Sequence, residues 1–155
     1  MAAVAMFYHL TRAGLDDTVT MIVTRAMAQG WRVMLRSIDL GLLQHLDDKL
    51  WLGAEDSFLP HGLEGGASDA DQPVLLGQGP IANGARGLVL LAGAGVARDE
   101  LDGLERVWLL FDGADEGAVQ AARGQWTLLT GWGLAAQYWS DEGGPWVKKS
   151  DKAAS

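Results

Sequence analysis

The chain of 155 residues is 48% hydrophobic and 21% charged, and it carries a net charge of −8. This length and balance suit one globular domain with a full hydrophobic core. Because cysteine is absent, a disulfide framework, a thiolate nucleophile and a Cys-based zinc site are all excluded. An acidic surface repels phosphate backbones, so we expect no tight direct binding to nucleic acid.

The sequence predicts neither a membrane-spanning segment nor an export signal. No apolar run approaches the roughly 18–20 residues that a transmembrane helix needs. The apolar start of the chain, residues 2–10, lacks the basic segment that precedes the core of a signal peptide. We therefore expect a cytoplasmic protein without a membrane partner.

Two strand–helix pairs are predicted in the first third of the chain. Residues 2–10 are apolar at nearly every position, as is typical of a buried strand in a parallel sheet. The helix after this strand keeps one apolar face as far as Met27, is capped by Asp16 or Asp17, and ends at Gly30.

The second pair leads into a loop with aromatic residues. Residues 31–35 predict a short strand, and Ser37 or Asp39 caps the next helix, which ends at Trp51. Pro60 disfavours a helical conformation at the residue before it, so the chain must turn after this helix.

The second half of the chain predicts further strands and one long helix. The strands are expected at residues 74–76, 88–91, 107–111 and 134–139. Residues 62–72, which are glycine-rich and acidic, predict a surface loop, and a helical turn is expected near residues 99–104. Asp115 caps a helix between the last two strands. Residues 141–155 predict a flexible tail with Trp146 as its one aromatic side chain.

Strands that alternate with helices predict a single α/β domain over residues 1–140, with a mostly parallel sheet flanked by helices. This architecture is Rossmann-like, but the chain lacks nucleotide motifs. No Gly-Lys pair occurs, which excludes a Walker loop, and the glycine pairs at residues 77–79 and 93–95 lack the rest of the dinucleotide fingerprint. We expect no cofactor.

Catalytic and metal-binding residues are not predicted either. His9, His45 and His61 occur in no metal-ligand spacing. The adjacent acids at residues 16–17 and 47–48 do not face each other on a helix. An enzyme is the weaker interpretation, and a nucleotide-dependent enzyme on a Rossmann-like fold remains the alternative on architecture alone.

Four segments together resemble a known family. Residues 46–51 read L-D-D-K-L-W, and residues 57–61 read S-F-L-P-H. Residues 6–8 give an aromatic first strand. The closing segment has Arg123, Trp126, Gly133, Leu134 and the pair Tyr138-Trp139. Over roughly residues 5–139, this pattern resembles the chi subunit of bacterial DNA polymerase III, a small accessory protein of the clamp-loader complex.

The resemblance implies a non-catalytic subunit of the replicative DNA polymerase III holoenzyme with two protein partners. One is the psi subunit, through which chi joins the clamp loader, and the other is the acidic, Phe-ending C-terminal tail of single-stranded-DNA-binding protein. The partner-binding residues that it implies are Trp51, Ser57, Phe58, Pro60, Arg123 and Trp126. We expect them to converge in one pocket, where the rings receive the Phe and Arg123 binds its carboxylate.

Plainer interpretations remain open for these residues. Trp51 and Phe58 can fill the core, Arg123 can be a solvated helix charge, and Trp126 can be a core residue. The chain also lacks basic residues that the family typically carries on the last helix. Their places are taken by Val119, Thr127 and Thr130. Weak tail binding is therefore expected, although each surface ion pair contributes only about 0–1 kcal/mol.

Overall fold

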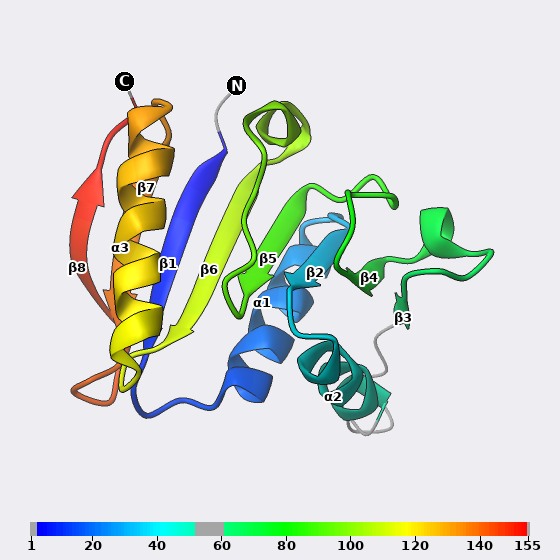
Figure 1. Ribbon diagram of the computed structural model, residues 1–155, viewed down its shortest axis with the longest axis horizontal. Coiled ribbons are helices and arrows are strands. Elements are labelled where there is room, and N and C mark those ends of the chain that lie inside the picture. The colour runs from blue at the N-terminus through cyan, green and yellow to red at the C-terminus, as the bar shows by residue number, and fades with distance from the viewer. Residues whose placement is uncertain (1–2, 52–60, 155) are drawn as a thin grey trace.

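One β-sheet organises the chain, and the computed structural model describes it for residues 3–51 and 61–154 (Figure 1). The strand order is β3-β4-β2-β5-β6-β1-β7-β8. Each neighbouring pair is parallel except β7 with β8, which is antiparallel. The predicted α/β fold, with a mostly parallel sheet flanked by helices, is confirmed.

The elements follow the predicted order along the chain, with β3 and β8 as strands that the sequence did not predict. The strands are β1 (Val4–Leu10), β2 (Val33–Ser37), β3 (His61–Leu63), β4 (Val74–Gly77), β5 (Gly87–Leu91), β6 (Arg106–Asp112), β7 (Ala135–Ser140) and β8 (Val147–Lys152). The helices are α1 (Leu15–Ala28), α2 (Leu40–Trp51) and α3 (Glu116–Gly131), with the short 3-10 helices η2 (Asp69–Asp71) and η3 (Arg98–Gly103).

The helices divide between the two faces of the sheet, and each face has its own hydrophobic core. Because side chains alternate along a strand, Leu109 and Phe111 of β6 lie on the face that α3 and η3 cover. Trp108 and Leu110 lie on the opposite face, which α1 and α2 cover. Helices α2 and α3 are therefore separated by the sheet itself.

The helix caps agree with the sequence for two of the three helices. Asp39 caps α2, because its Oδ1 accepts from the Leu42 N–H at 3.2 Å. Asp115 caps α3 in the same way, through the Ala118 N–H at 3.2 Å.

The predicted cap of α1 is wrong. Asp16 and Asp17 lie inside its first turn, and the N-cap is Gly14, which has no capping side chain. Both acids still favour this end of the helix, because their charge opposes the positive end of the helix dipole. Gly30 follows the helix with a φ of 82°, as predicted for a residue that ends it.

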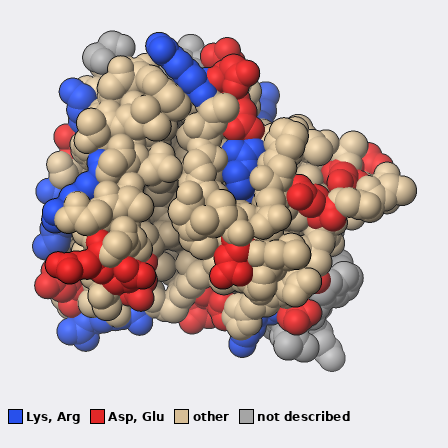
Figure 2. All heavy atoms as spheres, viewed as in Figure 1, with Lys and Arg blue, Asp and Glu red and all other residues tan. Residues whose placement is uncertain are grey.

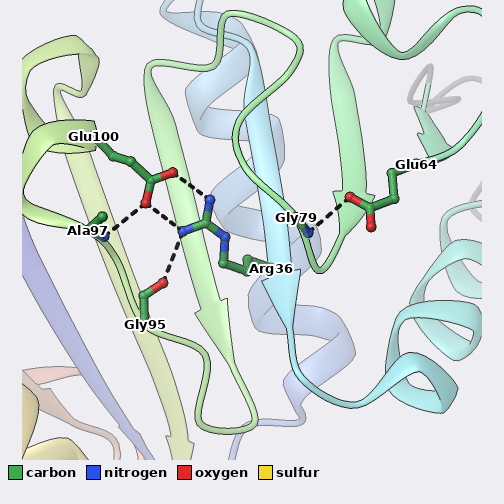
Figure 3. Close-up of polar contacts among 6 residues, drawn as sticks. All are labelled: Arg36, Glu64, Gly79, Gly95, Ala97 and Glu100. Atoms are coloured by element: carbon green, nitrogen blue, oxygen red, sulfur yellow. Dashed lines mark hydrogen bonds and ion pairs between the residues drawn. The ribbon is translucent and has the colours of Figure 1, made fainter.

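The segment predicted as a surface loop, residues 62–72, contains the short strand β3 and the helical turn η2. Three residues are too few to show periodicity in a sequence. Glu64 follows β3, and its carboxylate accepts from the Gln78 and Gly79 N–H groups at 3.0 and 3.1 Å, which holds the loop after β4 (Figure 3).

An ion pair between the buried Arg36 and the partly buried Glu100 joins β2 to η3 on the face that α3 covers. The Arg36 guanidinium binds the Glu100 carboxylate through two hydrogen bonds of 2.9 and 2.7 Å, and also donates to the Gly95 carbonyl (Figure 3). The hydrogen bond from Arg36 lowers the pKa of Glu100 despite the opposing effect of burial. This pair fixes η3 on the sheet.

The C-terminal segment differs most from the sequence-based expectation of a flexible tail. Residues 147–152 form β8, which pairs with β7 at the edge of the sheet. All six residues of β8 are exposed and five of them are polar, so the alternation that marks a half-buried strand is absent. Trp146 anchors the start of β8, with its ring centroid 5.0 Å from that of Tyr8.

Candidate functional site

Of the residues predicted to bind a partner, the structure describes Arg123 and Trp126 in full, and both lie on α3. Arg123 is exposed, and among the described residues it makes no ion pair or side-chain hydrogen bond. Trp126, one helical turn further along the same surface, is half-buried against the core. Both plainer interpretations hold in part: Arg123 is solvated, and Trp126 contributes to the core while still reaching the surface.

Trp126 belongs to an aromatic cluster that extends from α3 to β1 and β7. Its ring centroid lies 5.2 Å from that of Phe7 and 6.3 Å from that of Tyr138. Tyr138 is half-buried, and its hydroxyl lies 2.8 Å from Nδ1 of His9. Packing of this kind holds the rings in place before a ligand arrives.

Arg123 lies close enough to this cluster to influence it electrostatically. Burial raises the pKa of the Tyr138 hydroxyl, and the positive charge of Arg123 acts against that shift. A guanidinium beside half-buried rings suits a carboxylate attached to an aromatic or aliphatic group. Tyr138 occurs in the closing sequence pattern, but the sequence did not identify it as a site residue.

Glycine at position 113 allows the ring of His9 to lie under this cluster. A Cβ built at Gly113 would lie 2.0 Å from Nε2 of His9. His9 also contacts Phe111, with the ring centroids 5.4 Å apart. The sequence gives no signal for this contact, because Gly113 and His9 are far apart in the chain.

The three positions where the resemblance implies basic residues supply no charge. Val119 packs against the core. The hydroxyls of Thr127 and Thr130 donate to the Arg123 and Trp126 carbonyls of the same helix, at 3.2 and 2.7 Å. Arg123 is therefore the one basic residue on α3.

Of the second group of predicted residues, the structure describes only the backbone of Trp51, on α2. Trp51 is the last residue of α2, whose Leu43, Leu46 and Leu50 side chains pack in the opposite core. The Trp51 side chain and residues Ser57, Phe58 and Pro60 lie outside the described part of the chain. Within that part, the structure brings Arg123 and Trp126 together and places α2 across the sheet from them.

The comparison with protein families gives one match that spans most of the chain. The family model described as DNA polymerase III chi subunit, HolC, matches residues 1–137. The chain belongs to this family. No curated protein matches the chain. The match includes α3 and the start of β7, whereas β8 follows the matched residues.

This chi-family chain also has a cavity of about 550 Å³ at the carboxyl ends of β1, β5 and β6. Its lining is mostly apolar, with Thr11, Asp112, Asp115 and Gln125 as polar members. Doubly wound α/β folds commonly bind nucleotides at this position. The part of the chain that the structure describes holds no cluster of three His, Asp or Glu residues suited to a metal ion.

Beside this cavity, a buried carboxylate accepts hydrogen bonds from the backbone N–H groups that would otherwise bind a phosphate. Asp141 accepts from the N–H groups of Thr11, Arg12 and Ala13, in the loop between β1 and α1. Burial alone would raise the pKa of Asp141, but these backbone hydrogen bonds lower it overall. In nucleotide-binding relatives of this architecture the first strand–helix loop binds the phosphate, so the geometry argues against the nucleotide alternative.

None of the helices that the structure describes has both the length and the apolar character needed to cross a membrane.

Proposed function

We propose that this chi-family chain is a non-catalytic subunit of the DNA polymerase III holoenzyme with two protein contacts. One contact binds the acidic C-terminal tail of single-stranded-DNA-binding protein, and the other binds the psi subunit and, through it, the clamp loader. The observation that supports this proposal most directly is the exposed Arg123 guanidinium beside the half-buried rings of Trp126 and Tyr138.

The tail would bind with its last residue on the α3–β7 surface, which we define as Arg123, Trp126 and Tyr138. The terminal Phe ring packs against the two aromatic side chains, and Arg123 takes the terminal carboxylate in a bidentate contact. Ring burial contributes about 2 kcal/mol and the charge-assisted contact about 1.5–3 kcal/mol. Because association entropy opposes both, we expect a micromolar or weaker dissociation constant.

The second contact belongs to the α2 side of the sheet. Trp51, Ser57, Phe58 and Pro60 remain proposed partner-binding residues, and we assign them to the psi subunit. This assignment is supported by the position of α2, which packs on the face opposite to α3. A partner bound on α2 and a tail bound on α3 would lie on opposite faces of the sheet and would not compete for one surface.

Titration of an acidic, Phe-ending peptide by fluorescence anisotropy tests the tail contact. Arg123→Ala and Trp126→Ala should each weaken binding about tenfold or more, which corresponds to about 1.4 kcal/mol. Arg25→Ala is the matched control, because Arg25 is exposed on α1, across the sheet. If the Arg123 variant binds as tightly as the parent while the fold is intact, this surface is not the tail site.

A further inference from the structure

The edge strand β8 adds positive charge next to the α3–β7 surface. β8 has three lysines and one aspartate, a local charge of +2 in a chain whose net charge is −8. It pairs with β7 in a register that sets Ser150 opposite Tyr138 and Lys152 opposite Ala136. Lys and Arg side chains gather along the edge of the molecule that β8 forms in Figure 1, above a cluster of Asp and Glu where α3 begins (Figure 2).

The register also determines which lysine faces the site. Residues directly opposite each other in an antiparallel pair point to the same face. Ala136 and Tyr138 belong to the core beneath α3, so Lys152 lies on that face. Trp139 belongs to the opposite core, so its partner Lys148 lies on the far face.

The two lysines also differ in their contacts. Lys148 makes an ion pair with Asp151 at 2.8 Å. Lys152 is exposed and makes no ion pair among the residues that the structure describes. Adjacent strands lie about 4.8 Å apart and each residue advances about 3.4 Å, which places the Cα atoms of Lys152 and Tyr138 about 8 Å apart. That separation is close to the Debye length of roughly 8 Å at physiological ionic strength.

On the basis of the proposed function, we infer that Lys152 of β8 takes over the role of the basic residues missing at positions 119, 127 and 130. Arg123 orients the terminal carboxylate, whereas Lys152 attracts the acidic residues that precede it in the peptide. Lysines on edge strands also prevent sheets from associating edge to edge. Only the first role, attraction of the acidic peptide, predicts that removing the Lys152 charge weakens peptide binding, so a binding measurement distinguishes the two roles.

The experiment compares Lys152→Gln with Lys148→Gln in the full chain. Both variants remove one positive charge from the same strand, but Lys152 faces α3 and Lys148 faces away from it. With an acidic peptide that ends in Phe, Lys152→Gln should weaken binding about threefold at low salt and reduce its salt dependence. Lys148→Gln should bind as the parent does. Lys152→Arg keeps the charge and should also bind as the parent does.

A second peptide separates the electrostatic attraction by Lys152 from the binding of the terminal Phe on the α3–β7 surface. It keeps the terminal Phe but has amides in place of the preceding acids, and Lys152→Gln should not change its affinity. Equal affinities of Lys152→Gln and the parent for the acidic peptide, together with lost binding by Arg123→Ala, would overturn the inference and leave the proposed function standing. Equal losses from Lys152→Gln and Lys148→Gln would also overturn it, because net charge alone would explain them. Full binding by Arg123→Ala would overturn the proposed function itself.

Discussion

Two arginines on the same face of the sheet show how this molecule uses the same side chain in two ways. Arg36 is buried, and two hydrogen bonds join it to Glu100. Arg123 is exposed beside Trp126 and Tyr138, with no carboxylate partner among the described residues. The fold pairs the first guanidinium with an internal carboxylate and leaves the second available to a partner.

This difference separates stability from binding. A buried ion pair that loses one member leaves the other charge without compensation, which is costly. An exposed arginine without a partner contributes little to stability. Mutations in the β2–η3 region should therefore change the free energy of unfolding, whereas mutation of the exposed Arg123 should change peptide affinity.

Arg36→Ala should have the largest effect on stability. The change leaves the Glu100 carboxylate without its guanidinium and should lower the free energy of unfolding by about 3 kcal/mol. Urea denaturation followed by tryptophan fluorescence measures this loss. Glu100→Gln removes the negative charge but keeps a polar group, and it should cost less. A stability close to the parent value for Arg36→Ala would show that the two arginines do not differ as described.

Asp141→Asn should have the next largest effect on stability. An amide has one acceptor oxygen where the carboxylate has two, so at least one N–H of the loop at residues 11–13 loses its partner. We expect a loss of about 2 kcal/mol, which corresponds to a Tm lower by roughly 6 °C.

The same residue predicts how stability changes with pH. The pKa of Asp141 is lower in the folded chain than in the unfolded chain, so its contribution is complete above the unfolded pKa, near 4. That contribution is lost as the pH falls through the folded pKa. Thermal unfolding between pH 6 and pH 3 should therefore show a shallower decline for Asp141→Asn than for the parent. Parallel curves would contradict this account.

Arg123→Ala should leave stability within about 0.5 kcal/mol of the parent value, in contrast to Arg36→Ala. Because Arg123 is exposed, its removal leaves no buried group unsatisfied. Urea denaturation and peptide titration of both Arg36→Ala and Arg123→Ala test whether stability and binding depend on different arginines. A large loss of stability would mean that this arginine also serves the fold.

Thr127→Lys should give the smallest effect, a gain in peptide affinity of about threefold at low salt. Thr127 is exposed and lies one turn after Arg123, so a lysine there adds a second charge to the same helix surface. Raising the salt concentration should remove the gain. An unchanged affinity at low salt would place the acidic residues of the peptide away from α3.

The sequence predicted the parts of this molecule that depend on local pattern. Periodicity and the Asp115 cap predicted α3, and the spacing of Arg123 and Trp126 predicted that they share a surface. The strand order was not predictable, and this order decides that α2 and α3 lie on opposite faces. The sequence alone therefore could not show that α2, which ends at Trp51, lies across the sheet from Arg123 and Trp126.

The parts that the sequence did not predict depend on distant partners. Arg36 and Glu100 are 64 residues apart, and Asp141 binds backbone groups 128–130 residues away. β8 forms through backbone pairing with β7, so its polar side chains give no signal of a strand. Such contacts depend on the order of the strands in the sheet, and no short stretch of the sequence indicates that order.

The position of β1 has a consequence for the order in which the chain folds. β1 lies between β6 and β7, so Val4 pairs with Arg106 on one side and Ala135 on the other. Pairings over such long separations close large loops and form slowly. During synthesis, the first strand must remain without its neighbours until more than two thirds of the chain has been made. Phe7, from the first strand, packs against Trp126 and Tyr138, which are made late. The α3–β7 surface therefore forms only after β7 has been made.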